Sequence, residues 1–311
     1  MTETKPKTMF KFMEKRRIAA LCSAVLIIVS LTSVFTRGLN LGIDFTGGTL
    51  VEVGFSGSVE LDNVRNSLGG TEFSEATVQY FGSAKEILIR VAPEEDKNSA
   101  DIGAELMALL SAEGQQAELR RQEFVGPQVG EELTEDGGLA MLAALAMIMV
   151  YVAIRFQMRF SVGAIAALAH DVIITVGFFS LTQLNFDLTV LAAILAVIGY
   201  SLNDTIVVYD RIRENFRRMR KESAFDVLNI SLNQTISRTI ITSLTTLLVL
   251  SALFFVGGEI IHSFSAALII GVMIGTYSSI YIASPVILAL GVSKQDLMPV
   301  EKEGVDLPDS P

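Results

Sequence analysis

The sequence contains few of the residues on which disulfides, metal sites and nucleotide chemistry depend. Cys22 is the only cysteine, so no intramolecular disulfide can form, and a domain outside the membrane must be held together by its own core. The two histidines, His170 and His262, are too sparse for a recognisable metal motif. No G-x-x-x-x-G-K-[ST] phosphate-binding loop is present. We therefore expect no bound cofactor or metal and no enzymatic activity.

Charged residues are scarce as well, and apolar residues form long runs. Hydrophobic residues make up 50% of the 311 positions and the mean hydropathy is +0.49, which is too apolar for an ordinary soluble protein. Six runs approach or reach the ~20 residues needed to cross a hydrocarbon core of ~30 Å. The runs are Ile18–Thr36, Leu139–Ile154, Val162–Leu181, Leu188–Val208, Ile240–Val256 and Phe264–Leu290. The sequence predicts a polytopic α-helical membrane protein with six transmembrane helices.

The first run is preceded by basic residues, as is the core of a signal peptide. However, the run is longer than such a core, and no A-x-A-like cleavage site follows it. We therefore interpret it as an uncleaved anchor that forms the first transmembrane helix.

Two of the connections between the runs lack lysine and arginine altogether. These are the third and fifth connections, TQLNFD and GGEIIHS, whereas the second, the fourth and the segment before the first run are basic. By the positive-inside rule, six spans then place both termini in the cytoplasm. The predicted layout is a cytoplasmic segment at 1–17, helix 1 at 18–36, an external domain at 37–138, helices 2–6 at 139–290 and a cytoplasmic tail at 291–311.

The external segment is acidic and long enough for one small domain. Residues 37–138 contain 19 Asp or Glu and 7 Lys or Arg, so much of the net charge of −10 lies here and does not indicate nucleic-acid binding. Residue patterns predict strands at 49–56, 75–81, 86–92 and 117–125 and helices at 58–68 and 101–110. This order, β-α-β-β-α-β, is that of a ferredoxin-like α+β domain. We interpret its charged residues as a solvated surface, or alternatively as a surface that binds another protein.

Four ionisable residues lie within or at the ends of the apolar runs. A charge at the centre of a bilayer costs roughly 2.5–3.5 kcal/mol on insertion scales, so such a residue usually faces a partner or water. Asp171 lies about halfway along the third run, and adjacent His170 need not touch it, because neighbouring residues of a helix point about 100° apart. Asp204 and Arg238 lie near the cytoplasmic ends of the fourth and fifth runs and can share one depth if these helices pack together. The alternatives are an acid that reaches interfacial water and an arginine that snorkels.

Hydroxyl-bearing residues follow helical spacing next to these two charges. Thr242 and Thr246 continue the face that begins at Arg238, and Tyr200 lies one turn before Asp204. Such residues can line a polar path into the membrane. Threonine hydroxyl groups can also bond to the backbone of their own helix, which is the alternative interpretation.

Small residues recur at every fourth position of the sixth run. They are Ala267, Gly271, Gly275, Ser279 and Ala283. This spacing allows close packing of helices. The partner of this face is either another helix of the same subunit or a second protein.

Four segments of the sequence resemble one known family. They are GIDFTGGTLVEV after the first run, AHDVIITVGF in the third, GYSLNDTIVVYDRIREN at the end of the fourth and SRTIITSLTT at the start of the fifth. They closely resemble the SecF subunits of the bacterial SecDF accessory complex, and the similarity extends from the first run through the sixth. In the first segment, Asp44, Phe45, Gly47 and Gly48 form a motif that we interpret as a tight turn into the first strand, or as a hinge.

The resemblance implies a location and a function. SecF subunits are multi-pass proteins of the bacterial inner membrane with their soluble domain in the periplasm. They pair with SecD in a unit related to RND exporters and associate with the SecYEG channel. The resemblance thus implies a subunit that assists translocation of unfolded polypeptides, driven by the proton-motive force. The family's proton-pathway acid corresponds to Asp204 and its arginine to Arg238, with Asn203 in the same motif. Asp171 joins this proton-coupling set from another motif, with its role left open.

Three other functions are weighed against this one. A passive scaffold would hold SecD and dock periplasmic clients without ion coupling, and it would depend on the face of Gly271 and Gly275 rather than on Asp204. An intramembrane aspartyl protease needs two carboxyl groups that share a proton, and its G-x-G-D motif is absent here. A self-sufficient exporter is disfavoured, because six spans are half of an RND-type unit. The choice between H⁺ and Na⁺ stays open.

Overall fold

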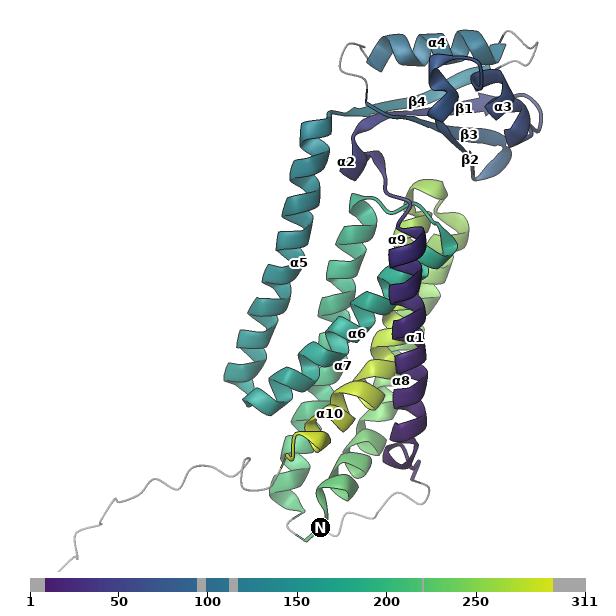
Figure 1. Ribbon diagram of the computed structural model, residues 1–311. Coiled ribbons are helices and arrows are strands. Elements are labelled where there is room, and N and C mark those ends of the chain that lie inside the picture. The colour runs from purple at the N-terminus through teal and green to yellow at the C-terminus, as the bar shows by residue number, and fades with distance from the viewer. Residues whose placement is uncertain (1–8, 94–98, 112–116, 220, 293–311) are drawn as a thin grey trace, which may run out of the picture.

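The computed structural model describes residues 9–93, 99–111, 117–219 and 221–292 of the chain. Within this part, six helical segments are long and apolar enough to cross a membrane, as the sequence predicts (Figure 1). They are α1 (Arg16–Arg37), α5 (Pro127–Arg155), α6 (Met158–Thr182), α7 (Leu188–Arg218), α8 (Ala224–Val256) and the segment formed by α9 (Glu259–Ser278) and α10 (Ser284–Ala289). A short helix, η1 (Met13–Lys15), precedes α1. Residues 1–8 of the predicted segment 1–17 and 293–311 of the predicted tail 291–311 lie outside the described residues.

Several helices extend beyond the apolar runs that predicted them. Helix α5 begins at Pro127, whereas the predicted run begins at Leu139. It starts there because Gly126 is extended and a proline in the first turn needs no hydrogen-bond partner for its nitrogen. Helix α7 continues past Val208 to Arg218. Hydropathy therefore locates the apolar part of each helix and misses its charged ends.

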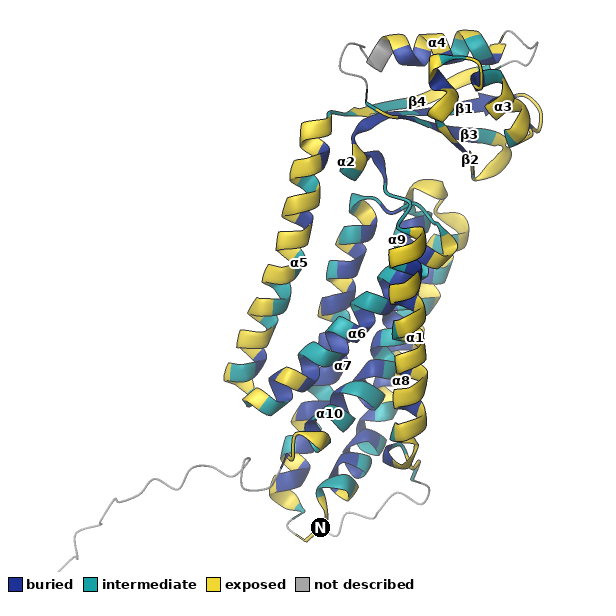
Figure 2. Cartoon of the chain, viewed as in Figure 1, coloured by how far each residue is buried: buried dark blue, intermediate teal, exposed yellow. Residues whose placement is uncertain are grey.

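Three helices form the centre of the bundle. Over their most apolar windows, α6, α7 and α9–α10 are 61, 50 and 50% buried, whereas α1, α5 and α8 are 22, 11 and 17% buried. Figure 2 shows the same contrast, with exposed residues along α5 and α1. Phe160 on α6 and Tyr209 on α7 pack edge to face, with 4.9 Å between ring centroids. The outer helices consequently present apolar faces to their surroundings.

Helix α1 packs against α6 through small residues. The buried residues of α1 are Ala19, Ser23, Ser30 and Ser33. Gly177 on α6 makes room for one of them, since a Cβ atom at Gly177 would lie 2.2 Å from Cβ of Ser30. The hydroxyl groups of Ser33 and Ser180 lie 2.8 Å apart. Close approach and hydroxyl contacts of this kind hold membrane helices together without a hydrophobic driving force between them.

The last membrane helix is not a continuous α-helix, as the run Phe264–Leu290 alone would suggest. A π-helical turn, η3 (Ser279–Ala283), separates α9 from α10. Pro285 lies two residues after the turn. Proline cannot donate a backbone hydrogen bond and clashes with the carbonyl group four residues before it. The wider π turn relieves this conflict, and the hydroxyl of Ser284 donates to the carbonyl of Ser279 at 3.2 Å. The turn begins next to Ser278, a residue of the candidate site described below.

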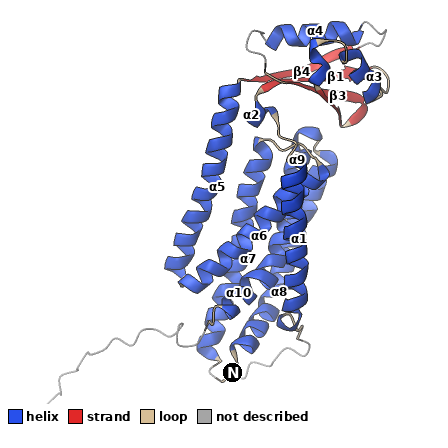
Figure 3. Cartoon of the chain, in the orientation of Figure 1, coloured by secondary structure: helices blue, strands red, loops and turns tan. Residues whose placement is uncertain are grey.

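A four-stranded antiparallel sheet lies at one end of the bundle (Figure 3). Its strands are β1 (Gly48–Phe55), β2 (Thr77–Phe81), β3 (Ser83–Val91) and β4 (Ala117–Val125), in the order β2-β3-β1-β4. Helix α3 (Leu61–Leu68) and the short helix η2 (Glu72–Glu75) follow β1, and helix α4 (Ser99–Ser111) follows β3. Along the chain, all of these elements lie between α1 and α5, together with the four-residue helix α2 (Ile43–Thr46).

The two faces of the sheet have different surroundings. Alternate residues such as Val51 and Val53 on β1 and Ile87 and Ile89 on β3 are fully buried in a core that includes Leu106 of α4. The residues between them point to the opposite face, which is directed at the membrane helices in Figure 1. The sheet therefore has one face covered by its own helices and one face turned toward the end of the bundle.

Candidate functional site

The carboxylate of Asp171 lies at the centre of the helical bundle and is 1% exposed. Nδ1 of the adjacent His170 lies 2.9 Å from Oδ1, because the imidazole ring reaches back although neighbouring residues of a helix diverge. The hydroxyl groups of Ser201 on α7 and Ser278 on α9 donate to Oδ2 at 2.6 and 2.8 Å. One side chain therefore joins the three central helices.

The contacts continue from His170 to α1. Nε2 of His170 lies 3.2 Å from Oγ of Ser23, and this oxygen lies 3.0 Å from the hydroxyl of Tyr277 on α9. Tyr277 donates to the carbonyl of Ala19 at 2.7 Å, and its ring stacks on the imidazole with 6.0 Å between centroids. We refer to His170, Asp171, Ser201, Ser278, Ser23 and Tyr277 as the Asp171 network.

The hydrogen bonds of this network satisfy the polar atoms of the His170 and Asp171 side chains. Tyr277 uses its proton on the carbonyl of Ala19, so its oxygen accepts from Ser23, and the oxygen of Ser23 accepts from Nε2 of His170. On the other side of the ring, Nδ1 is hydrogen-bonded to Oδ1 of Asp171. Both nitrogens of His170 and both oxygens of Asp171 therefore have hydrogen-bond partners. A charge that is paired and hydrogen-bonded is far less costly to bury than an isolated one.

The predicted packing residues of the sixth run lie where α9 meets α7. A Cβ atom at Gly275 would lie 2.9 Å from Cβ of Ser201, and one at Gly271 would lie 2.1 Å from a methyl group of Val197. The two glycines thus let α7 approach α9 closely enough for Ser201 and Ser278 to share one carboxylate. Of the two partners that the sequence leaves open for this face, the structure places a helix of the same subunit against it.

Asp204 lies one turn beyond Ser201 on α7 and has very different surroundings. It is 4% exposed, and its Oδ2 has no hydrogen-bond partner among the described residues. Arg238 acts on it electrostatically but is itself exposed, and no ion pair joins the two side chains in the part of the chain that the structure describes. Asn203 is exposed on the outer side of α7. Asp204 and Arg238 are therefore neighbours at a similar depth, without direct contact.

The packing of α8 against α7 identifies a further residue near Asp204. The two helices run in opposite directions, and Tyr200 on α7 donates to Oγ of Ser243 on α8 at 3.5 Å. One turn further along each helix, toward the connection between α7 and α8, brings Asp204 opposite Thr239. The hydroxyl of Thr239 is buried and also has no partner among the described residues. Two unsatisfied polar groups thus lie on facing sides of α7 and α8.

The threonine stripe of α8 does not by itself form a continuous polar path. The hydroxyl groups of Thr242 and Thr246 donate to the backbone of their own helix, at Arg238 and Thr242, with distances of 3.1 and 2.9 Å. A hydroxyl contact between helices comes instead from Ser243, whose Oγ lies 2.7 Å from that of Thr276 on α9. Of the predicted path residues, Tyr200 is the one that reaches another helix.

The two carboxylates have different chemical possibilities. Both oxygens of Asp171 are bonded to side chains of the central helices, so the carboxyl group is held in one arrangement. Asp204 has a buried oxygen with no hydrogen-bond partner in the described part of the chain, so it can accept a proton there without breaking a bond seen in the structure. Among the described residues, no three His, Cys, Asp or Glu side chains are grouped in a way that could hold a metal ion.

The turn motif that precedes β1 connects the sheet to the bundle. Oδ2 of Asp44 accepts a hydrogen bond from the backbone nitrogen of Leu188 at 3.0 Å, and the ring of Phe45 packs against that of Phe186, 5.9 Å away. Gly47 and Gly48 have φ values of 68° and 112°, and a Cβ atom at Gly47 would lie 2.9 Å from the backbone of Pro127. The motif thus brings the start of β1 against the start of α5 and the end of the α6–α7 connection.

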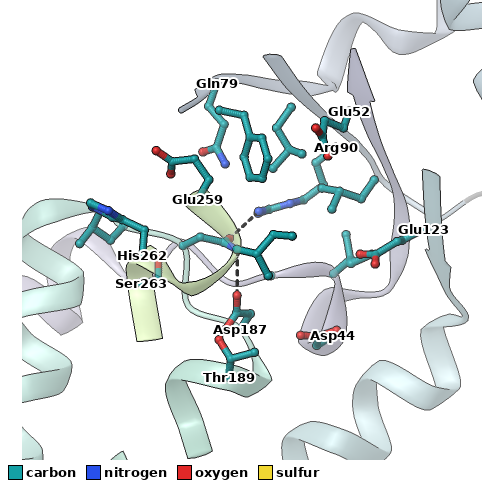
Figure 4. A pocket seen from close by; sticks show the side chains of 18 of the residues that line it. Asp44, Glu52, Gln79, Arg90, Glu123, Asp187, Thr189, Glu259, His262 and Ser263 are labelled. Carbon is teal, nitrogen blue, oxygen red and sulfur yellow. Dashed lines mark hydrogen bonds between the residues drawn. The ribbon is translucent and has the colours of Figure 1, made fainter. Parts of the chain in front are cut away.

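A cavity of about 460 Å³ lies between the open face of the sheet and this end of the bundle (Figure 4). Its walls include Glu52, Arg90 and Glu123 from the sheet and Asp187 and Glu259 from the starts of α7 and α9. The charged residues of the external domain are predicted to be solvated, and for Arg90 that prediction is wrong. Its guanidinium group donates to the carbonyl of Leu41 at 2.5 Å and is only partly accessible.

Sequence reasoning missed most residues of the Asp171 network. Ser23, Ser201, Ser278 and Tyr277 are polar residues in apolar runs, and none of them carries a charge that would make it stand out. One pattern in the sequence could have identified the packing face of α1, because its small residues lie on one side of an otherwise bulky helix. Contact between α1 and His170 joins residues that are 147 positions apart, which no local pattern predicts.

The matching families are described as Protein export membrane protein SecD/SecF, C-terminal, over residues 105–293, and SecD/SecF GG Motif, over residues 32–59. Two similar relatives, from Vibrio alginolyticus and Pseudomonas aeruginosa, are each named Protein translocase subunit SecF. They are 51 and 50% identical to this chain and cover 96 and 95% of it, and the chain covers 96% of each relative.

Two solved structures are similar in fold as well as in sequence. The crystal structure of SecDF, a translocon-associated membrane protein, from Thermus thermophilus is 39% identical over 91% of this chain, with a TM-score of 0.83. A crystal structure of SecDF in a super-membrane-facing form is 40% identical over 91% of the chain, with a TM-score of 0.68. The chain spans 39% of the length of each solved chain.

Proposed function

Because the chain belongs to the SecF family of protein translocase subunits, we propose that it assists the translocation of unfolded polypeptides by using the proton-motive force. In this proposal Asp204 is the residue that takes up and releases the proton. The observation that supports it is the buried carboxyl oxygen of Asp204, which has no partner among the described residues. A proton that moves through 100 mV releases roughly 2.3 kcal/mol, which is a usable energy source for a subunit without nucleotide chemistry.

The proposed coupling acts through the contacts of α7. When Asp204 is protonated, its neutral carboxyl group can stay buried opposite Thr239. When Asp204 is ionised, its charge is attracted to Arg238 at the cytoplasmic end of α8. Alternation between these states changes how α7 packs against α8. Because the Asp171 network holds α7 to α6 and α9, the three central helices move relative to α8 as a group.

The proposed topology places the molecule in the bacterial inner membrane with both termini in the cytoplasm. The sheet domain is then periplasmic, because it lies between the first two spans. We further propose that this domain is ferredoxin-like. Its strand order, with β1 and β3 in the centre, and the helices after β1 and β3 support that assignment.

The proposed partners are SecD, the SecYEG channel and the translocating polypeptide. The partnership with SecD is supported by the similarity to solved SecDF chains, of which this chain spans less than half. The outer helices offer surface for such a partner or for lipid, because α5 and α8 are largely exposed along their apolar length. No nucleic-acid partner is expected from the acidic composition.

The decisive experiment measures translocation into inner-membrane vesicles that contain SecD and either wild-type protein or Asp204→Asn, with the proton gradient imposed or collapsed. We expect the variant to insert and bind SecD normally and to lose the gradient-dependent part of translocation. Asp210→Asn is the matched control, because Asp210 is an exposed acid of the same helix that faces Arg155 and Arg213. If Asp204→Asn keeps the gradient-dependent part, the subunit acts as a passive scaffold. Replacing H⁺ by Na⁺ gradients in the same assay identifies the coupling ion.

A further inference from the structure

A single arginine of the sheet bonds to two segments of the membrane bundle at once. Nη1 of Arg90 on β3 donates to Oδ1 of Asn40 at 3.2 Å and to the carbonyl of Leu41 at 2.5 Å. Nη2 donates to Oδ1 of Asn185 at 2.7 Å. Asn40 and Leu41 belong to the linker that follows α1, and Asn185 belongs to the connection between α6 and α7. Figure 4 shows Arg90 extending from the sheet toward this connection.

The two segments that Arg90 joins are also paired with each other. Leu41 and Phe186 form a parallel β-bridge, the backbone nitrogen of Phe186 donates to the carbonyl of Asn40 at 2.8 Å, and that of Gly42 donates to the carbonyl of Phe186 at 2.7 Å. A Cβ atom at Gly42 would lie 3.1 Å from Cβ of Asp187, so glycine permits this close approach. The linker and the connection therefore form one unit at the start of α7.

Two carboxylates next to Arg90 complete this unit. Oδ1 of Asp187 accepts from the backbone nitrogen of Val190 at 3.0 Å, and Oδ2 of Asp44 accepts from that of Leu188. These bonds satisfy free nitrogens at the first turn of α7, where negative charge is also favoured by the helix dipole. Burial lowers the pKa of the Arg90 guanidinium from its ordinary value, while the charges of Asp187 and Asp44 oppose this shift. Arg90 is thus held close to the acids that cap α7.

The cavity makes these bonds important for the position of the sheet. Below its open face the sheet is not packed continuously against the helices, because a space of about 460 Å³ separates them. Elsewhere the domain approaches the bundle at the Gly82 turn, where an added Cβ atom would lie 3.0 Å from Glu259, and at Gly47 next to Pro127. These are contacts of backbone and aliphatic atoms, and Asp44 adds one bond from its carboxylate to Leu188 in the turn before β1. Arg90 supplies charged hydrogen bonds from a strand of the sheet itself, and such bonds are worth more than neutral ones.

From this geometry we infer that Arg90 is the positioning residue that fastens the sheet domain to the start of α7, so that a displacement of α7 is carried to the domain. The second half of this inference rests on the proposed function, since Asp204 lies on the same helix. A shift of α7 moves Asn185 and Asp187 with it. Arg90 transmits that movement across the cavity into β3, the second strand of the sheet, which pairs with both β2 and β1.

The first test measures the attachment itself and needs no proton gradient. Cys22 is replaced by Ala, and spin labels are placed at Lys85 in the sheet domain and at Thr182 at the end of α6, both exposed. Distances between the labels are measured in the complex with SecD in lipid nanodiscs. In Arg90→Gln we expect a displaced population that is roughly tenfold larger than in the parent, as the loss of charged hydrogen bonds implies. An unchanged distribution would overturn the inference.

Two controls separate loss of attachment from loss of folding. Arg121→Gln removes another arginine from the wall of the same cavity, one that pairs with Glu123 on its own strand, and should leave the distribution unchanged. A second label pair at Lys85 and Asn63, both within the sheet domain, should report the same distance in Arg90→Gln as in the parent. If this internal distance also changes, the domain has unfolded and Arg90 is a folding residue, contrary to the inference.

The second test measures transmission in the vesicle assay. Arg90→Gln should lose the gradient-dependent part of translocation and keep the gradient-independent part, whereas Arg121→Gln should keep both. If Arg90→Gln shows the displaced population but retains gradient-dependent translocation, Arg90 fastens the domain without transmitting movement, and that half of the inference is wrong. Failure of the proposed function gives a different result, because then Asp204→Asn retains gradient-dependent translocation while the distance measurement is unaffected.

Discussion

Asp171 and Asp204 are both buried acids of the central helices, and comparing them separates two uses of a carboxylate in a membrane. Asp171 is bonded on both oxygens by residues of three helices and is paired with His170. Asp204 lies on the next turn of α7 from Ser201 and has an oxygen without a partner among the described residues. Burial alone is nearly the same for the two, at 1 and 4% exposure. The difference lies in whether the surrounding side chains form hydrogen bonds with the carboxyl group.

The largest expected difference is between two alanine variants. Asp171→Ala removes three hydrogen bonds, so we expect the free energy of unfolding to fall by about 3 kcal/mol, at roughly 1 kcal/mol for each bond. Asp204→Ala removes a carboxylate with an oxygen that has no hydrogen-bond partner among the described residues. The free energy of unfolding of this variant should therefore stay within about 1 kcal/mol of the parent value. Unfolding of the purified proteins in mixed detergent micelles measures both. Equal losses in the two variants would contradict the comparison.

A smaller effect is expected at the seam between α7 and α9. The methyl group of Gly271→Ala would meet Val197, and overpacking of this kind typically costs about 1–3 kcal/mol. Gly199→Ala on α7 is the matched control, since nothing lies within 4 Å of a Cβ atom there. Adding Val197→Ala to Gly271→Ala should restore most of the lost stability. The same unfolding measurement compares the single and double variants. If the double variant is no more stable than Gly271→Ala, the packing of Gly271 against Val197 does not limit the approach of Ser201 to Asp171.

The smallest effect is expected at the edge of the Asp171 network. Tyr277→Phe keeps the ring that stacks on His170 and removes the hydroxyl that bonds to Ala19 and Ser23, so the expected loss is about 1 kcal/mol. Tyr151→Phe, at an exposed position of α5, should change nothing. The vesicle assay then separates the two acids by function. Tyr277→Phe should leave gradient-dependent translocation intact, whereas Asp204→Asn should abolish it. Loss of translocation in Tyr277→Phe would extend the proton-coupling role to the Asp171 network.

The sequence predicts the parts of the fold that depend on periodic patterns. Long apolar runs locate the six helices, and alternating residues locate the strands, because each pattern follows from the repeat of one element. The charged ends of α5 and α7 are not predicted, since hydropathy responds only to the apolar part of a helix. The π turn before Pro285 is also missed, because proline indicates that a helix is disturbed but not in which way.

The candidate site is predicted less completely, and for a different reason. The sequence alone identifies Asp204, Arg238 and Asp171, because a charge in an apolar run is costly wherever it lies. Their hydroxyl-bearing partners cannot be identified in this way, because a serine or threonine can bond to its own helix, as Thr242 and Thr246 do. Whether a hydroxyl group bonds to its own backbone or to another helix depends on packing. Arg90 is missed in the same way, since one arginine in an acidic domain resembles any solvated charge until the linker and the connection are brought together.

The π-helical turn at Ser279–Ala283 has a consequence for how the last helix tolerates changes in length. A π turn contains one residue more than the corresponding stretch of α-helix, so it corresponds to a single-residue insertion that the helix has absorbed locally. Deleting one residue within it, together with Pro285→Ala to remove the clash that the π turn relieves, should therefore regularise the helix and keep Ser278 and Ile287 on the faces they now occupy. A deletion elsewhere in α9 should instead rotate every following residue by about 100°. Homologous chains that differ by one residue here can thus keep the same inward-facing side chains.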